Sequence, residues 1–401
     1  MGVSDWSSGF AENVAEFPIR AMPARLTAPS AIAPRPWLYG TYLLRGFVSV
    51  LVAAGGVGKS MLAMSTALSC CIGKPLLGHY VHAKVNAWIF NLEDPLDEMD
   101  RRLAACIMQH GIDPTEIDGA LYMNSGRDNR LCVGKVGPDG VTILYPHKEA
   151  IIAQCKELGI GVIVVDPFVK SHELDENRNG DMDAAVTAWA EIASQANSAV
   201  LLVHHVRKGP VVDIEAARGG KALIDGARVG LTMQSMSDDE AKSLGISAED
   251  RGRYVRLDDG KANLAPKAAK AAWFEIKMVN LGNGTPDYPN GDNVGTLVPW
   301  EPPSAFDGLS LEDCNAALDL IAAGLPDGQL YAPSRRGRSN TRWAGNVLMR
   351  EYEIEEGPAA RIVDTWVKNG VLEITKYQHN GKEYSGVLVV NGKRPGVVHE
   401  G

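Results

Sequence analysis

The stretch VAAGGVGKSMLA, Val52 to Ala63, decides the fold. An apolar run, GFVSVLV, leads into it, and a helical pattern, SMLAMSTALSC, leads out of it. The glycines Gly55, Gly56 and Gly58 let the backbone curl, so that several N–H groups point to one place at the positive end of the following helix. A strand, a glycine-rich loop and a helix in this order predict a phosphate-binding loop.

Lys59 and Ser60 follow the glycines and supply what a bound nucleotide needs. The lysine would neutralise the β- and γ-phosphates of ATP, and the serine hydroxyl would bind Mg²⁺. The usual motif begins with glycine where this chain has Ala53, but the flanking strand and helix restore the context. A glycine-rich turn without a ligand is the alternative. The residues expected around ATP are Gly55, Gly56, Val57, Gly58, Lys59, Ser60 and Met61.

Two further apolar runs end on acidic residues. IGVIVVD ends on Asp166, which would complete the Mg²⁺ site at the carboxyl edge of a sheet, unless it only caps the next turn. NAWIFNLEDP places Glu93 and Asp94 beyond another strand, where one carboxylate could orient and deprotonate water. Either residue could instead cap a helix. The pattern predicts a nucleotide-hydrolysing site with one of these two acids as its base.

Histidine and arginine candidates come later in the chain. LLVHHVRKG places His204 and His205 at a strand end with their side chains on opposite sides, so at most one contacts the γ-phosphate. Ordinary core or solvent-facing histidines are the alternative. Arg218 lies in the glycine-flanked segment EAARGGKALIDGAR. It is either a solvated residue or, in a ring, an arginine that reaches the γ-phosphate of a neighbouring subunit.

Short β-rich runs alternate with longer helical patterns up to about residue 280. This alternation predicts an α/β fold in which a mainly parallel sheet carries helices on both faces. Strands are expected at Phe47–Ala53, Val85–Leu92, Ile160–Asp166, Val200–His204 and Val229–Met233, with helices such as Ser60–Cys71 and Met182–Ala196 between them.

The region after residue 308 follows a different pattern. Ser310 and Asp313 predict a capped helix, and two more helices are expected, one over Thr341–Tyr352 and one from Pro358 to Gly370. Asn380-Gly381 then predicts a hairpin turn. Three helices and a hairpin predict a small winged helix-turn-helix domain. The expected parts are a Pro/Ala-rich arm (1–36), an ATPase domain (37–280), a Gly/Pro/Asn-rich linker (281–308), the winged-helix domain (309–395) and a tail (396–401).

Composition excludes several classes of protein. The formal net charge of −9 argues against electrostatic coating of nucleic acid, although residues 331–401 carry 11 Lys and Arg against 8 Asp and Glu. The six cysteines form no CxxC pair, which argues against a disulfide framework or a zinc site. No apolar run approaches the roughly 18 residues of a membrane span, and no signal peptide pattern begins the chain. A cytoplasmic protein without membrane contact is expected.

Six segments in order carry a family resemblance: LVAAGGVGKSMLA, NLEDP, VIVVD, LVHHVRKG, ARGGKALID and DGKANLAP. They resemble the RepA-type hexameric DNA helicases of broad-host-range plasmids, within the RecA/DnaB-like superfamily, over residues 37–278. The resemblance implies a RecA-like core and a ring-shaped homo-oligomer, expected to be a hexamer. It also implies single-stranded DNA and an initiator or loader protein as partners.

The resemblance also implies roles. Glu93 would be the catalytic base, Asp166 the Walker B carboxylate, and Arg218 the arginine finger of the adjacent subunit. His205 would sense the γ-phosphate, with His204 beside it, and Lys261 would lie near the subunit interface. The loops after the Asp166 and His205 strands would face single-stranded DNA, although neither offers an aromatic residue for base stacking. The first loop is acidic, and structural ordering by Glu176 and Asn177 is its alternative role. The cationic residues of the two loops are Lys170, Arg178, Arg207, Lys208 and Lys221.

The C-terminal part resembles the winged-helix domain of some mobile-element and phage RepA-like ATPases. Its basic segment, SRRGRSNTRW, offers Arg335, Arg336, Arg338 and Arg342 as phosphate contacts, and the third helix offers Arg361, Thr365 and Lys368. Docking of another protein is the alternative use of such a domain.

These features favour an ATP-dependent helicase or translocase on single-stranded DNA that serves replication of a plasmid, phage or mobile element. The alternative is a DNA-binding ATPase without unwinding activity, either a recombination mediator or an ATP-switched regulator. An enzyme acting on a small molecule and a non-catalytic nucleotide-binding protein are weaker alternatives.

Overall fold

A computed structural model describes residues 21–137, 140–206, 220–266, 270–335 and 341–396 of the 401-residue chain. The chain divides into two units, Met1–Pro36 and Trp37–Gly401. In the described part of the first unit, Pro29–Ala31 forms a short 3-10 helix, η1, and the other residues form neither helix nor strand.

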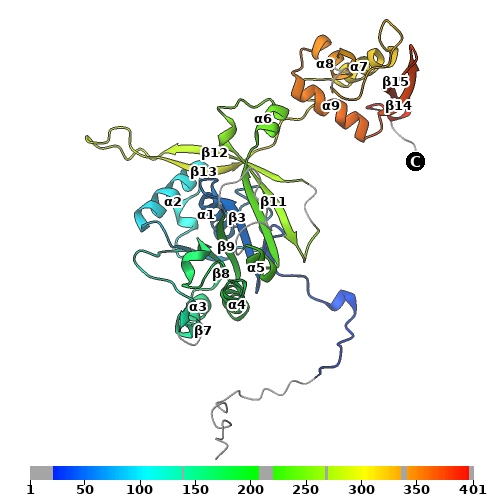
Figure 1. The fold of residues 1–401 in the computed structure, drawn as a ribbon. Coiled ribbons are helices and arrows are strands. Elements are labelled where there is room, and N and C mark those ends of the chain that lie inside the picture. The colour runs from blue at the N-terminus through cyan, green and yellow to red at the C-terminus, as the bar shows by residue number, and fades with distance from the viewer. Residues whose placement is uncertain (1–20, 138–139, 207–219, 267–269, 336–340, 397–401) are drawn as a thin grey trace, which may run out of the picture. The chain divides into compact units, whose positions relative to one another are not determined.

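A nine-stranded sheet forms the centre of the second unit, with the order β13-β12-β11-β10-β3-β9-β8-β4-β5 (Figure 1). Neighbours from β10 to β5 pair in parallel, whereas β11, β12 and β13 join the β10 edge antiparallel. The predicted α/β fold with a mainly parallel sheet is confirmed. The strands are β3 (Val48–Ala54), β4 (Asn86–Asn91), β5 (Leu121–Ser125), β8 (Ile160–Asp166), β9 (Ala199–Val206), β10 (Val229–Ser235), β11 (Tyr254–Ala262), β12 (Ala272–Asn280) and β13 (Asn293–Pro299).

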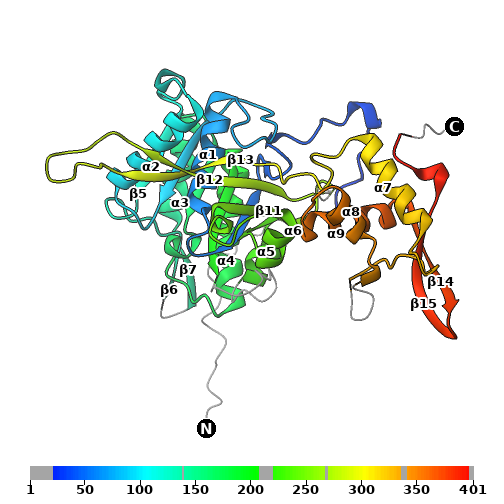
Figure 2. The same cartoon turned by 90° about the horizontal axis from the view of Figure 1, so that it is seen from above.

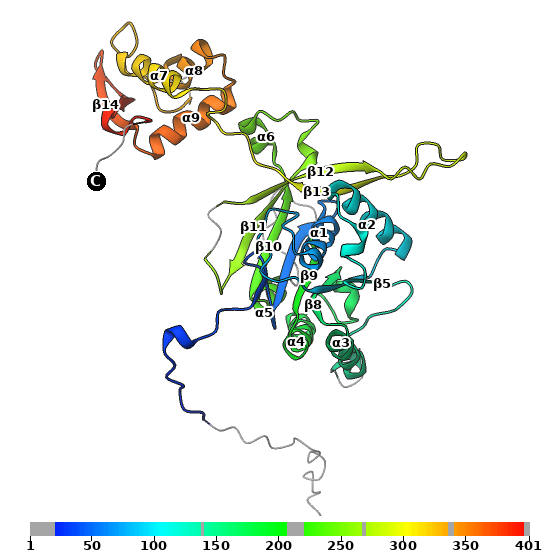
Figure 3. The same ribbon diagram turned by 180° about the vertical axis from the view of Figure 1, so that it is seen from behind.

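Apolar side chains leave both faces of the central strands, because successive residues of a strand point to opposite sides. Leu51 of β3 and Val164 of β8 belong to one buried cluster, and Val50 and Val165 belong to another. Helices α1 (Lys59–Ile72) and α2 (Leu96–His110) supply the first cluster. Helices α3 (Tyr145–Glu157) and α4 (Asn179–Ala196) supply the second and lie side by side (Figure 3). The helices therefore cover both faces of the sheet, as predicted.

The predicted strands and helices are present with small shifts at their ends. The strand Ile160–Asp166 coincides with its prediction, and α4 begins at Asn179, three residues before the predicted Met182. The remaining short elements of this region are β1 (Trp37–Tyr39), β2 (Leu43–Leu44), η2 (Pro114–Glu116), β6 (Gly134–Gly137), β7 (Gly140–Ile143), η3 (Phe168–Ser171), α5 (Gly220–Gly226), α6 (Asp238–Leu244) and η4 (Arg251–Arg253).

The predicted linker 281–308 is wrong for residues 293–299, because these form β13 and pair with β12. The glycines and prolines before them build the tip of the β12–β13 hairpin, where Thr285 and Tyr288 exchange backbone hydrogen bonds of 3.1 Å. This hairpin projects beyond α2 (Figure 2). Composition rich in turn residues indicated a loop but did not distinguish a hairpin tip from a connection between domains.

The C-terminal elements are α7 (Leu311–Ala323), α8 (Gly345–Glu351), α9 (Glu356–Lys368), β14 (Leu372–His379) and β15 (Lys382–Val389), followed by η6 (Asn391–Lys393). The predicted capping box of Ser310 and Asp313 is present. Helix α9 begins two residues before Pro358, because proline is tolerated within the first turn of a helix. Asn380 and Gly381, with φ of 48° and 73°, make the predicted hairpin turn.

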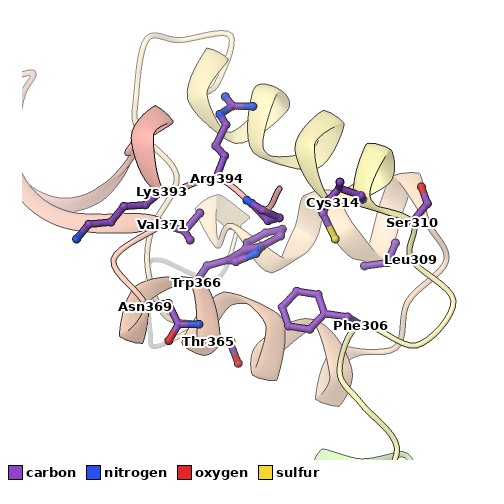
Figure 4. Close-up of a pocket in the computed structure, with 12 residues that line it drawn as sticks. Phe306, Leu309, Ser310, Cys314, Thr365, Trp366, Asn369, Val371, Lys393 and Arg394 are labelled. Carbon is purple, nitrogen blue, oxygen red and sulfur yellow. The ribbon is translucent and has the colours of Figure 1, made fainter. Parts of the chain in front are cut away.

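A cavity of about 660 Å³ lies among the C-terminal helices (Figure 4). Phe306, Leu309 and Trp366 give it a mainly apolar wall. The indole Nε1 of Trp366 is buried without a hydrogen-bond partner among the described residues. This cavity contains none of the residues predicted to bind the nucleotide.

The helices, the possible metal ligands and the cysteines each bear on function. Every helix in the described ranges is too short or too polar to cross a lipid bilayer. The same ranges hold no group of three or more His, Cys, Asp and Glu side chains arranged for a metal ion. All six cysteines are buried as free thiols.

Candidate nucleotide-hydrolysis site

The predicted phosphate-binding loop connects β3 to α1. Gly56 and Gly58 adopt φ of 81° and 98°, a conformation that favours glycine, and Gly58 is the N-cap residue of α1. The loop therefore curls at the carboxyl end of a central parallel strand and presents the N-terminus of a 14-residue helix. This is the backbone geometry that binds a phosphate group.

Lys59 is the buried cation of the loop, with 4 % of its surface exposed. Its Nζ donates hydrogen bonds to the carbonyl oxygens of Ala53 at 3.1 Å and Ala54 at 2.5 Å. Burial lowers the pKa of Lys59 to about 8, and the negative charges of Asp166 and Glu93 oppose that shift. The three predicted residues therefore lie close enough to interact electrostatically.

Ser60 and Asp166 place two oxygen ligands together. The Ser60 hydroxyl donates to Oδ2 of Asp166 at 2.6 Å, and the other carboxylate oxygen lies 3.6 Å from Nε2 of His205. A carboxylate and a hydroxyl beside a phosphate-binding loop suit Mg²⁺, which prefers oxygen ligands and uses few from the protein. The described residues thus fit the predicted Mg²⁺ and ATP.

Asn91 organises the two acidic residues that follow β4. Its Oδ1 accepts hydrogen bonds from the backbone N–H groups of Glu93, at 3.0 Å, and Asp94, at 2.9 Å. The Asp94 carboxylate pairs with Arg102 at 2.7 Å, whereas the Glu93 carboxylate is exposed and has no hydrogen bond or ion pair among the described residues. Of the two predicted candidates for the base, Glu93 is therefore the one whose carboxylate has no hydrogen bond or ion pair among the described residues.

A family comparison agrees with this geometry. Residues 15–211 match the model of the AAA domain family AAA_25. This segment is a P-loop ATPase domain of the RecA/DnaB-like family. It contains Lys59, Ser60, Glu93, Asp166 and His205. The match supports nucleotide-dependent activity and ATP hydrolysis.

The two histidines at the end of β9 in the AAA domain differ in environment, as strand alternation predicted. His205 faces Asp166 and keeps 37 % of its side chain exposed. His204 is buried, and its Nδ1 has no partner among the described residues. Burial lowers the pKa of His204 to about 4, with smaller contributions from the charges of His205 and Lys59. His205 is therefore the one positioned beside the Mg²⁺ ligand.

Several predicted residues lie outside the described residues: Arg207, Lys208, Arg218, Arg336 and Arg338. Lys221 belongs to α5, but its side chain is not described. Lys261 donates to the carbonyl oxygens of Ile224 at 2.8 Å and Asp225 at 3.1 Å, so it holds the end of α5.

The basic residues of the C-terminal region make internal contacts. Arg335 pairs with Glu356 and lies over the Trp343 ring at 6.0 Å. Arg342 donates to the Tyr377 hydroxyl at 3.0 Å and lies over the Tyr384 ring at 4.8 Å. These contacts give Arg342 a structural role that the basic segment alone did not reveal.

The end of β5 and the loop after it form hydrogen bonds with the loop that carries Glu93, and the sequence did not predict these contacts. The Arg127 Nε donates to the carbonyl oxygen of Glu93 at 2.8 Å, and the Ser125 hydroxyl donates to that of Asp94 at 2.8 Å. The Gly126 N–H donates to the carbonyl oxygen of Asn91 at 2.7 Å. A side chain at Gly126 would meet the backbone of Leu92, since an added Cβ lies 2.7 Å from its Cα.

Gly126→Ala should therefore displace the loop that carries Glu93. We expect the maximal rate of ATP hydrolysis to fall about tenfold or more, because small displacements of a catalytic group are costly. The affinity for ATP should change much less, because Gly126 is not part of the phosphate-binding loop. Steady-state hydrolysis and nucleotide titration measure the two effects. An unchanged rate in a folded variant would contradict this role of Gly126.

His172, which follows η3, predicts an acid sensitivity of stability. Burial lowers its pKa from 6.5 to about 4, although the negative charge of Asp181 opposes the shift. Between these pH values the unfolded chain binds a proton that the folded chain does not, so stability falls as pH falls from 6.5 to 4. At pH 5 the loss from this group is ~2 kcal/mol relative to pH 7.5. Urea unfolding measures the free energy of unfolding at both pH values. The difference between the two values should be smaller for His172→Gln than for the wild type, and an identical difference would refute the assignment.

Proposed function

We propose that this protein is an ATP-driven helicase or translocase that acts on single-stranded DNA as a ring of identical subunits, like the RepA-type helicases. One observation carries the proposal. Lys59, the Ser60–Asp166 pair and an exposed, unpaired Glu93 lie together at the carboxyl edge of a parallel sheet, within a RecA/DnaB-like ATPase domain. Hydrolysis by such a site supplies the energy for movement.

The chemistry assigned to these residues is the attack of water on the γ-phosphorus, which breaks its bond to the bridging oxygen of the β-phosphate and releases ADP and phosphate. Glu93 accepts a proton from that water, and Lys59 offsets the charge that develops on the phosphate oxygens. Ser60 and Asp166 would hold Mg²⁺, which would offset negative charge on the phosphates. The contact of His205 with Asp166 supports a role for His205 in sensing the γ-phosphate.

Arg218 completes the site in this proposal by reaching it from the adjacent subunit. The resemblance of its segment to RepA-type helicases supports this assignment, because an arginine supplied in trans stabilises the transition state of phosphoryl transfer. A ring follows, since each site then lies between two subunits. We propose that the ring contains six subunits.

The C-terminal domain is proposed to be a winged helix that binds DNA, with protein docking as the alternative. The order α7, α8, α9, β14, β15 supports the winged-helix assignment. Thr365 of the predicted recognition surface is less available to DNA, because its hydroxyl donates to the carbonyl oxygen of Arg361 at 2.7 Å. Arg361 in turn donates to the carbonyl oxygen of Pro303 at 2.8 Å.

Strand separation on a forked duplex tests the helicase directly. The wild type is expected to release a labelled strand in the presence of Mg²⁺ and ATP, and Arg218→Ala is expected to release none. Mixing Arg218→Ala with Lys59→Ala subunits should restore some hydrolysis, because the mixed rings contain some intact interfaces. DNA-stimulated hydrolysis without strand release would support the alternative, an ATPase that acts as a mediator or switch. If the mixed subunits are shown to assemble together and still do not hydrolyse ATP, the assignment of Arg218 to the site is wrong.

A further inference from the structure

We propose that a cavity of the ATPase domain binds a phosphate group of the single-stranded DNA and that this binding affects the position of Glu93. The cavity is about 420 Å³ and lies among the loops that follow β5 and β8. This inference rests on the proposed function, because the DNA strand is the partner assigned there. It adds a binding site to residues that the sequence did not bring together.

Three cationic side chains line this cavity. Arg127 and Arg130 come from the loop after β5, and Lys170 comes from η3 after β8. Glu173 also lines it and pairs with Arg130, so the four side chains carry an excess of positive charge. Lys170 is exposed and has no ion pair among the described residues. A cavity with this charge attracts a phosphodiester more strongly than a neutral or cationic group.

His172 also lines this cavity. It is 6 % exposed, and its Nδ1 accepts a hydrogen bond from the backbone N–H of Leu174 at 3.2 Å. A neutral imidazole that accepts at Nδ1 carries its hydrogen on Nε2. That Nε2 is buried and has no partner among the described residues. Because this atom is inaccessible, the cationic side chains carry the proposal.

The cavity is connected to the catalytic carboxylate through Arg127. Arg127 lines the cavity, and its Nε donates to the carbonyl oxygen of Glu93 at 2.8 Å. Leu92, the residue before Glu93, lines the cavity as well, and its N–H donates to the carbonyl oxygen of Asp166 at 2.8 Å. A phosphate bound at Arg127 thus acts on the loop that holds Glu93. Strand binding would in this way change the rate of hydrolysis.

A phosphate ligand could come from a nucleic acid strand or from free phosphate, and the test separates the two. The double variant Arg130→Gln/Lys170→Gln removes two cations of the cavity. The control Lys84→Gln/Lys156→Gln removes the same charge from exposed residues that precede β4 and β8, at the opposite edge of the sheet. The probes are a labelled 20-nucleotide oligothymidylate, followed by fluorescence anisotropy at several salt concentrations, and inorganic phosphate and pyrophosphate as competitors.

The double variant is expected to bind the oligothymidylate about tenfold or more weakly than the wild type. The slope of the logarithm of its affinity against the logarithm of salt concentration should become shallower by about 0.7, since the cavity holds one phosphate of the strand. Stimulation of ATP hydrolysis by the strand should fall with it, and the control variant should match the wild type in both. Thermal unfolding establishes that both variants fold.

Two results would overturn the inference. Equal strand affinity in the double variant and the wild type would remove the cavity from DNA binding while leaving the proposed function intact. If phosphate or pyrophosphate displaces the oligothymidylate at a concentration lower than the total concentration of phosphate groups in the strand, the cavity is a site for free anions and not for a strand. Failure of the wild type itself to bind the strand would be a failure of the proposed function, which makes the two distinguishable.

Discussion

Replacing Lys59 with alanine is expected to reduce ATP hydrolysis by on the order of a thousandfold. Lys59 is the buried cation of the phosphate-binding loop, and its Nζ lies against the carbonyl oxygens of Ala53 and Ala54. Alanine leaves those carbonyls without their donor and leaves the charge that develops on the γ-phosphate uncompensated. The affinity for ATP should fall as well, because a lysine contacts the phosphates in the ground state too.

Steady-state phosphate release and nucleotide titration measure these effects. Lys74→Ala is a suitable control, because it removes an exposed lysine whose only described ion pair is with Glu116, and exposed pairs contribute about 1 kcal/mol or less. The control should hydrolyse ATP like the wild type. A Lys59→Ala protein that is folded and retains more than a tenth of the activity would show that the loop is not the hydrolysis site.

Glu93→Gln is expected to reduce the maximal rate by roughly 100- to 10,000-fold, the range for removal of a general base. The glutamine preserves the size of the side chain and the backbone hydrogen bonds of the Glu93 N–H and carbonyl oxygen. ATP should therefore still bind, and the loss should appear in kcat with little change in KM.

Asp94→Asn is the matched control for that variant. It makes the same chemical change one residue away, on a carboxylate that already pairs with Arg102 and accepts from Asn91. We expect a loss of less than about tenfold, since the change weakens a partly exposed ion pair. If Asp94→Asn lost the larger share of activity, the assignment of the base to Glu93 would be wrong and Asp94 would take its place.

The elements that carry the site were predictable because their signals are local. The apolar run before Gly55 and the helical pattern after Ser60 gave β3 and α1 nearly to the residue. The apolar run that ends on Asp166 gave β8 in full. The phosphate-binding loop follows β3 and Asp166 ends β8, and the carboxyl ends of parallel strands lie at one edge of a sheet, so Ser60 and Asp166 could be expected to meet.

What the sequence did not predict depends on contacts between distant residues. Arg127 has no local motif, and its bond to Glu93 exists only because β5 pairs beside β4. Arg102 likewise pairs with Asp94 across a loop, which is why Glu93 and Asp94 could not be separated earlier. Strand β13 was hidden because the turn residues on both sides of it resemble a linker. Non-local pairing of this kind overrides local composition.

If ATP hydrolysis drives movement on single-stranded DNA, the strand should change the rate of hydrolysis. The steady-state rate of ATP hydrolysis by the wild-type protein is measured with and without a long oligothymidylate, at saturating Mg²⁺ and ATP. We expect the strand to raise the rate several-fold and Lys59→Ala to reduce hydrolysis on the order of a thousandfold in both conditions. A wild-type rate that is the same with and without the strand would contradict the account.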